Sequence, residues 1–168
     1  MSQVFVSGHK SPDTDSIAAA LSYSYLKRRL GMDAVAVRAG EINKESRFAL
    51  DYFNLEEPML VTSVARKNPE DEKQKVILVD HNESKQTIDG MDDAEVLEII
   101  DHHRFGDFES ENPIFILVRP VGCVNTVIYG LYKANHIKPS REIAGIMLSA
   151  IISLSLIHIS EPTRPRLI

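Results

Sequence analysis

The chain has 168 residues, of which 43% are hydrophobic and 26% are charged, and its net charge is -5. These values predict one globular domain with its own core. The single cysteine, Cys123, excludes an internal disulfide and is most simply a small core hydrophobe in a reducing cytosol. Residues 1–6 lack the pattern of a signal peptide, no apolar run reaches the roughly 18 residues of a membrane span, and the acidity disfavours nucleic acid. We therefore expect a cytoplasmic protein that binds neither membranes nor nucleic acid.

Predicted strands alternate with predicted helices along the chain. In chain order we expect a strand at 3–7, a helix at 16–30, a strand at 34–39, a helix at 44–53, strands at 60–63, 76–79, 96–100 and 114–118, and helices at 125–136 and 141–152. The first helix follows from the four-residue spacing of Ile17, Leu21 and Tyr25. The last three strands are almost uniformly apolar, which is typical of strands buried in a parallel sheet. The pattern predicts a Rossmann-like α/β domain, with a mainly parallel sheet and helices on both faces.

The last fifteen residues, 154–168, follow no pattern that completes an element. Pro162 and Pro165 are incompatible with a continuing helix. The segment resembles translated sequencing-adaptor sequence, of the kind that ends some assembled reading frames. We therefore predict that the domain covers 1–153 and that 154–168 is a non-native or disordered tail.

Three short groups of histidine and aspartate residues each come directly after a predicted strand. They occupy 8–16, 79–83 and 100–104. The carboxyl ends of parallel strands share one edge of the sheet, and ligands bind there near the point where the strand order reverses. We therefore expect the side chains of the three groups to converge. The residues expected to meet are His9, Asp13, Asp15, Asp80, His102 and His103.

Mixed histidine and aspartate ligands indicate a divalent transition ion such as Mn²⁺ or Co²⁺ rather than Ca²⁺. Several carboxylates drawn together repel one another, and two divalent ions would turn that repulsion into binding. Two ions roughly 3.5–4 Å apart can share a carboxylate and a water, which loses a proton near neutral pH and becomes a nucleophile. The groups therefore predict a two-metal centre with a water nucleophile, as in a metal-dependent hydrolase.

Each of these residues also has a structural explanation when it is taken alone. Asp13 or Asp15 can cap the helix that follows, and Asp80 can be a turn residue. A His-His pair such as His102 and His103 is more often at the surface or in the core than bound to a metal. We favour the metal site because all three groups fall on one predicted edge.

The three groups resemble the motifs of the DHH phosphoesterase superfamily, which is named for an Asp-His-His sequence such as that at 101–103. Within it the similarity is closest to the manganese-dependent, or family II, inorganic pyrophosphatases. Gly-His-x-x-Pro-Asp-x-Asp-Ser at 8–16 resembles their first motif, Val-Asp-His-Asn-Glu at 79–83 their second, and Ile-Asp-His-His-Arg at 100–104 their third. The resemblance covers about residues 1–153.

The resemblance implies hydrolysis of diphosphate to two phosphates with two Mn²⁺ ions, Co²⁺ or Mg²⁺ being alternatives. The implied metal ligands are His9, Asp13 and Asp80 for one ion and Asp15, Asp80 and His102 for the other. His103 would act on the substrate as an acid or hydrogen-bonding group, and Asp101 would orient a histidine. The expected substrate-binding residues are His81, Asn82 and Arg104. The family pairs through this domain, so a homodimer is also expected.

The chain departs from the family pattern in two places. Leu154 stands where a further bridging aspartate is expected. The second domain, which in the family closes over the site and supplies lysine and arginine to the diphosphate, is missing. We therefore expect this chain to bind Mn²⁺ weakly and to hydrolyse diphosphate very poorly.

Two other functions are compatible with the motifs. One is a DHH phosphodiesterase or exonuclease that acts on short or cyclic nucleotides. Those relatives often have a glycine between the two aspartates of the first motif, where this chain has Thr14. The other is a non-catalytic fragment that associates through an edge strand near 114–118.

Overall fold

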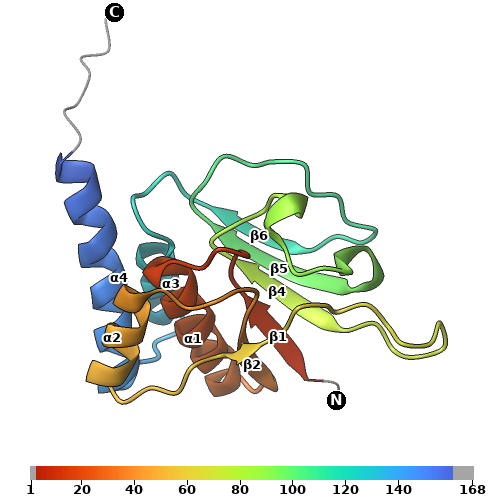
Figure 1. Ribbon diagram of the computed structural model, residues 1–168, viewed down its shortest axis with the longest axis horizontal. Coiled ribbons are helices and arrows are strands. Elements are labelled where there is room, and N and C mark those ends of the chain that lie inside the picture. The colour runs from red at the N-terminus through yellow and green to blue at the C-terminus, as the bar shows by residue number, and fades with distance from the viewer. Residues whose placement is uncertain (1–2, 161–168) are drawn as a thin grey trace, which may run out of the picture.

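Six parallel strands form a sheet in the order β3-β2-β1-β4-β5-β6 (Figure 1). The computed structural model describes residues 3–160, and side chains as far as Leu154. The strands are β1 (Val4–Ser7), β2 (Ala34–Arg38), β3 (Met59–Leu60), β4 (Lys75–Val79), β5 (Glu95–Asp101) and β6 (Phe115–Val118). The helices are α1 (Thr14–Arg29), α2 (Lys44–Tyr52), α3 (Val124–Ala134) and α4 (Arg141–Ser160), with short 3-10 helices η1 (Ser84–Gln86) and η2 (Met91–Asp93). The predicted α/β domain with a parallel sheet is confirmed.

The order of the strands reverses between β1 and β4. From β1 the chain adds β2 and β3 on one side, and it then returns to add β4, β5 and β6 on the other. The segments that follow β1 and β4 therefore diverge at the carboxyl edge of the sheet, which is where open α/β sheets bind ligands. The first two predicted groups, at 8–16 and 79–83, flank this point.

The two faces of the sheet are covered differently. Helices α1 and α3 pack on one face, and α4 and α2 lie against α1 (Figure 1). On the other face, Leu78 and Ile99 pack against Val64 and Ile88, which belong to loops. Within residues 3–160, the α-helices expected on both faces lie on one face, and the other face carries η1, η2 and loops. The β4–β5 connection contains the short 3-10 helices η1 and η2 in place of an α-helix, and Gly90, with a φ of 78°, precedes the second of them.

Helix α1 begins where its sequence provides a cap. Asp13 Oδ1 accepts a hydrogen bond from the Ser16 amide at 2.9 Å, and three basic residues occupy the last turn, where they complement the helix dipole. Small buried side chains at 18–20 let α1 approach the sheet and α4 closely. The capping role considered for Asp13 is confirmed, and it also holds the first group against the start of α1.

Helix α4 continues beyond its predicted end. Ser140 Oγ accepts from the Ile143 amide at 3.3 Å, as a capping residue would, and the helix runs to Ser160. The predicted end at Ile152 is wrong because neither proline nor glycine occurs between Ile152 and Pro162. Residues 161–168 lie outside those described, and the foreign origin of 154–168 stays a prediction. Within 3–160 no helix is both long and apolar enough to cross a membrane.

Candidate metal centre

The three histidine and aspartate groups meet at the carboxyl edge of the sheet. The first follows β1, the second begins at the last residue of β4, and the third begins at Ile100, one residue before the end of β5. The predicted convergence is therefore confirmed for the loops. Two clusters of potential ligand atoms result, each with all its atoms within 4.8 Å of one another. One comprises His9, Asp13 and Asp80, and the other comprises Asp80, Asp101, His102 and His103.

Asp80 belongs to both clusters and has an unusual backbone conformation. Its φ is 63°, in the left-handed region that non-glycine residues seldom adopt, and its side chain is 2% exposed. Its amide donates to the Ile100 carbonyl at 3.0 Å, which keeps the residue attached to β5. Such a conformation costs about 1–3 kcal/mol and persists where the surrounding structure imposes it, commonly at functional sites.

The two oxygens of Asp80 face two different histidines. His102 Nε2 lies 3.1 Å from Oδ1, and His9 Nε2 lies 3.4 Å from Oδ2. Burial raises the pKa of Asp80, but its hydrogen bonds with His102 and His9 outweigh burial and hold the pKa below its usual range. Conversely, burial lowers the pKa of His102, but the Asp80 carboxylate outweighs it and raises the pKa to about 9. Asp80 is therefore an ionised carboxylate placed between two imidazoles.

Asp13 completes the cluster around His9. Its Oδ1 lies 3.8 Å from His9 Nε2, while the same atom caps α1. Burial lowers the pKa of His9, but Asp80 and then Asp13 outweigh burial, so that the pKa lies above its ordinary value. The capping role and a role beside His9 are compatible, because the cap fixes the carboxylate where it faces the imidazole.

Asp101 accepts hydrogen bonds from the protein at both of its carboxylate oxygens. Its Oδ1 accepts from the amides of His102 and His103, at 2.7 and 3.2 Å, and contacts His103 Nδ1 at 2.9 Å. Its Oδ2 accepts from Asn82 Nδ2 at 2.5 Å. The hydrogen bond to Asp101 raises the pKa of His103, whose side chain is 54% exposed. This arrangement is what an orienting carboxylate and an accessible histidine require.

Asp15, in the first turn of α1, lies between the metal centre and the start of α3. Its Oδ2 lies 3.7 Å from His102 Nε2, yet its carboxylate also accepts from the Val124 amide at 2.8 Å and from Asn125 Nδ2 at 2.6 Å. Burial, and then the negative charge of Asp80, raise the pKa of Asp15 to about 6. Asp15 is thus held mainly by the start of α3 and faces the centre with one oxygen.

The residues present fit a divalent ion. The Asp80 carboxylate and the His9 imidazole are mostly buried and face one another at 3.4 Å, an arrangement that needs either a proton or a cation between the oxygen and the nitrogen. Imidazole and carboxylate ligands suit Mn²⁺ or Co²⁺. Ligand sets on both sides of Asp80 also agree with the predicted bridging position. The division of ligands between two ions remains a prediction.

The three expected substrate-binding residues differ in how exposed their side chains are. His81 is 2% exposed, its Nδ1 contacts the Val79 carbonyl at 2.9 Å, and burial lowers its pKa to about 4. Asn82 is also buried; it donates to Asp101 and to the Arg104 carbonyl and accepts from the Gly106 amide. Arg104 has an 88% exposed side chain that lies 3.5 Å from Glu83. Of the three, Arg104 alone has an exposed side chain, whereas Asn82 anchors the loop after Asp101.

The sequence analysis missed the polar residues at the start of α3. Cys123 is buried as predicted, but its thiol also lies 2.9 Å from Asp15 Oδ1. Asn125 is fully buried against the same carboxylate. The available signal was position, since both residues follow β6 at the same carboxyl edge as the other groups.

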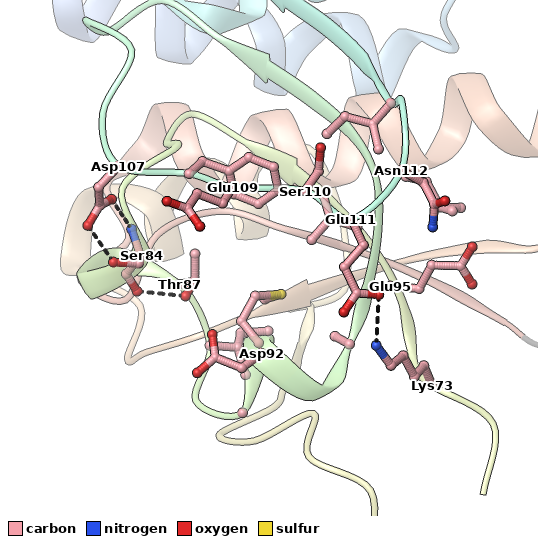
Figure 2. Close-up of a pocket in the computed structure, with 18 of the residues that line it drawn as sticks. Lys73, Ser84, Thr87, Asp92, Glu95, Asp107, Glu109, Ser110, Glu111 and Asn112 are labelled. Carbon is pink, nitrogen blue, oxygen red and sulfur yellow. Dashed lines mark hydrogen bonds and ion pairs between the residues drawn. The ribbon is translucent and has the colours of Figure 1, made fainter.

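A separate cavity of about 830 Å³ lies between η1, η2 and the loop before β6. Figure 2 shows its polar lining, with Ser84 bonded to Asp107 and Lys73 paired with Glu111. None of the candidate metal ligands lines it. Its acidic side chains are Asp89, Asp92, Glu95, Asp107, Glu109 and Glu111. This lining disfavours an anionic ligand in the cavity.

The fold and the site together define a class: a parallel α/β domain with a histidine–aspartate centre suited to divalent ions at its switch point. Comparison with known families agrees with this class. The model of the DHH family, N-terminal domain, matches residues 3–151. The chain therefore belongs to the DHH family.

Individual relatives are similar over nearly the whole chain. A "Probable manganese-dependent inorganic pyrophosphatase" of Bacillus licheniformis is 52% identical over 163 residues, and one of Exiguobacterium sp. is 50% identical over the same length. Each match covers 97% of this chain and 51% of the relative, so the chain spans about half the length of these relatives.

Two solved structures are also similar to this chain. A Methanococcus jannaschii structure, assigned by its name to the family II inorganic pyrophosphatases, superimposes with a TM-score of 0.81 at 36% identity. The match covers 97% of this chain and 52% of that one. An exopolyphosphatase-related protein from Bacteroides fragilis has a TM-score of 0.65 at 17% identity, which shows a shared fold alone.

Proposed function

We propose that the chain provides the metal-binding half of an inorganic pyrophosphatase, which hydrolyses diphosphate to two phosphates with Mn²⁺. The observation that carries the proposal is the position of Asp80, whose two carboxylate oxygens face His9 and His102 separately. The names of relatives at about half sequence identity support the substrate and the ion. The Mn²⁺ ligands would be His9, Asp13 and Asp80 on one side and Asp15, Asp80 and His102 on the other.

Residues of this chain would each have a separate role in the reaction. When bound, divalent ions supply Lewis-acid chemistry at phosphoryl oxygens and at water. Asp101 orients His103 through Nδ1, and the raised pKa of His103 favours the protonated ring. His103 would then give a proton to the leaving phosphate as water attacks the other phosphorus and the bridging P–O bond breaks. Arg104 would bind a phosphate through its charge.

The chain alone should be a poor catalyst. Its relatives are about twice as long, and a second domain that supplies cationic groups to diphosphate would be needed for turnover. Leu154, which takes the place of the expected aspartate, packs against the apolar cluster that contains Ile17 and Cys123. An apolar side chain there offers nothing to a cation.

The proposal is tested by assaying phosphate release from diphosphate and from a dinucleotide, with Mn²⁺ binding measured by calorimetric titration. We expect Mn²⁺ binding, slow release of phosphate from diphosphate, and none from the dinucleotide. His103→Ala should lower the rate by roughly 100-fold or more and leave Mn²⁺ affinity nearly unchanged. Lys138→Ala, on the loop before α4, serves as a control that should retain the rate.

Two outcomes would contradict the proposal. Preferential cleavage of the dinucleotide would identify a phosphodiesterase. Phosphate release that survives His103→Ala unchanged would remove the role given to His103.

A second copy of the chain is the protein partner that we propose. Strand β6 forms one edge of the sheet, and its Phe115 and Ile116 are 49% and 43% exposed. An exposed edge with apolar side chains is suited to pairing with the same strand of another copy.

A further inference from the structure

The start of α3 is capped by a residue from another helix. Cys123 occupies the N-cap position but makes no side-chain capping bond of its own. The amides of Val124 and Asn125 instead donate to the Asp15 carboxylate, at 2.8 and 3.2 Å. The first amides of a helix lack partners within the helix and favour a negative charge. Asp15, in the first turn of α1, therefore satisfies the start of α3 across the interface between the helices.

The Asn125 side chain clamps Asp15 at two points. Its Nδ2 donates to Asp15 Oδ1 at 2.6 Å and to the Asp15 backbone carbonyl at 3.1 Å. Ser22 Oγ donates to Asn125 Oδ1 at 3.0 Å, which fixes the orientation of the amide. The opposite orientation would place the amide oxygen against the carboxylate. Asn125 and Ser22 are both fully buried, so this contact has no competition from solvent.

The two carboxylate oxygens of Asp15 consequently differ in the number of hydrogen bonds that they accept. Oδ1 is engaged by Asn125, through both its amide groups, and by the thiol of Cys123. Within the part of the chain that the structure describes, Oδ2 accepts from the Val124 amide alone, and it lies 3.7 Å from His102 Nε2. A carboxylate oxygen has two lone pairs, so Oδ2 retains the capacity to bind a cation, whereas Oδ1 does not.

We propose that Asn125 is a positioning residue for the metal centre: by holding Asp15 Oδ1, it presents Oδ2 to an ion shared with Asp80 and His102. This inference rests on the proposed metal centre. The simpler explanation is that Asn125 only joins α1 to α3. The two explanations differ in what the loss of Asn125 does to metal binding.

The chain offers a matched control for the simpler explanation. Tyr132, also on α3, donates to the Ser22 carbonyl on α1 at 2.6 Å and is fully buried. Tyr132→Phe removes one buried hydrogen bond between the same two helices without touching Asp15. It should destabilise the domain and leave the metal centre as it was.

The experiment compares Mn²⁺ binding by the unsubstituted 168-residue chain, Asn125→Ala and Tyr132→Phe, using calorimetry and the EPR signal of free Mn²⁺. We expect Asn125→Ala to weaken one binding event about 10- to 100-fold, as is typical when a partner of a metal ligand is removed. Tyr132→Phe should keep its affinity within about twofold. Urea unfolding of each variant reports the structural effect separately.

Ser22→Ala keeps the test decisive if Asn125→Ala does not fold. It releases the amide of Asn125 but keeps its contact with Asp15, so we expect a weaker loss of affinity in the same direction. Unchanged affinity in a folded Asn125→Ala protein, or in Ser22→Ala where Asn125→Ala does not fold, would overturn the positioning role. So would an equal loss in Tyr132→Phe.

The outcomes also separate this inference from the proposed function. If the unsubstituted chain binds no Mn²⁺, the metal centre fails and the positioning role fails with it. If it binds Mn²⁺ but cleaves the dinucleotide in preference to diphosphate, only the proposed function fails. A reduced affinity in Asn125→Ala would support the positioning role in that case too.

Discussion

Neighbouring histidines at this sheet edge differ in charge because their partners differ. His102 faces the ionised Asp80, which raises its pKa to about 9 against the effect of burial. His81 is next to Asp80 in sequence but turns into the interior, where its Nδ1 meets a backbone carbonyl and burial lowers its pKa to about 4. For its Nε2 no hydrogen-bond partner exists within the described side chains. His81 is therefore a neutral residue of the core, and burying its unpaired ring nitrogen costs free energy of folding.

The burial of His81 predicts a loss of stability in acid. Its folded pKa lies below the ordinary value of 6.5, so the unfolded chain binds the extra proton first as the pH falls. The stabilisation is fully present above pH 6.5 and is lost between 6.5 and about 4. In the metal-free protein this amounts to about 2 kcal/mol between pH 7.5 and pH 5.

Urea unfolding of the unsubstituted chain and of His81→Asn at both pH values isolates this effect, because the other titrating groups are common to both. The unsubstituted chain should lose about 2 kcal/mol more than His81→Asn. Parallel losses in the two proteins would show that His81 is not held neutral.

At the scale of elements, the first motif depends on a close approach of β1 to the start of α1. Gly8 follows β1, and Ser16 Oγ in the first turn of α1 accepts from the His9 amide at 3.1 Å. A Cβ atom at position 8 would overlap Ser16 Oγ and press on its Cβ and backbone oxygen. The glycine is thus required by packing against Ser16, and His9 is placed by the same contact.

Gly8→Ala should therefore destabilise the domain by about 1–3 kcal/mol and weaken Mn²⁺ binding, because Ser16 must move and His9 moves with it. Gly130→Ala, in α3, is the matched control. Among the described residues, no atom outside the helix's own backbone lies within 4 Å of an added Cβ there, so the substitution should be neutral or stabilising by up to about 1 kcal/mol. Thermal unfolding and calorimetric titration of both variants provide the comparison. Equal behaviour of the two variants would refute the packing explanation for Gly8.

At the scale of the molecule, the sheet ends differently on its two sides. Strand β3 has only two residues, whereas β6 has four and exposes Phe115 and Ile116. Parallel pairing with β5 leaves the outer edge of β6 free to bond another strand. Association through β6 would extend the sheet from one copy into the next.

We expect the chain to sediment as a dimer and Ile116→Lys to sediment as a monomer, because a charge on an edge strand opposes pairing. Analytical ultracentrifugation over a range of concentrations measures the change. Leu148→Lys, which places the same charge on an exposed apolar position of α4, is the control and should remain dimeric. Dissociation by Leu148→Lys alone would assign the interface to α4 instead.

Local patterns in the sequence were sufficient to predict the helices and strands and the edge of the sheet at which the site lies. Four-residue apolar spacing marks α1, apolar runs mark β4 and β5, and each motif follows a strand. In a parallel sheet these facts alone place the motifs together, since every strand points the same way. For this reason His9, Asp80 and His102 could be brought together without any knowledge of their contacts.

Only the tertiary structure decided how each side chain turns. Asp15 meets Asn125 across a separation of 110 residues, Asn82 turns inward to Asp101, and the α-helices gather on one face of the sheet. A contact between residues so far apart in the chain produces no periodic pattern in the sequence. Their contacts depend on how α1 and α3 pack and on how the loops after β4 and β5 close, which are properties of the assembled domain and not of any segment.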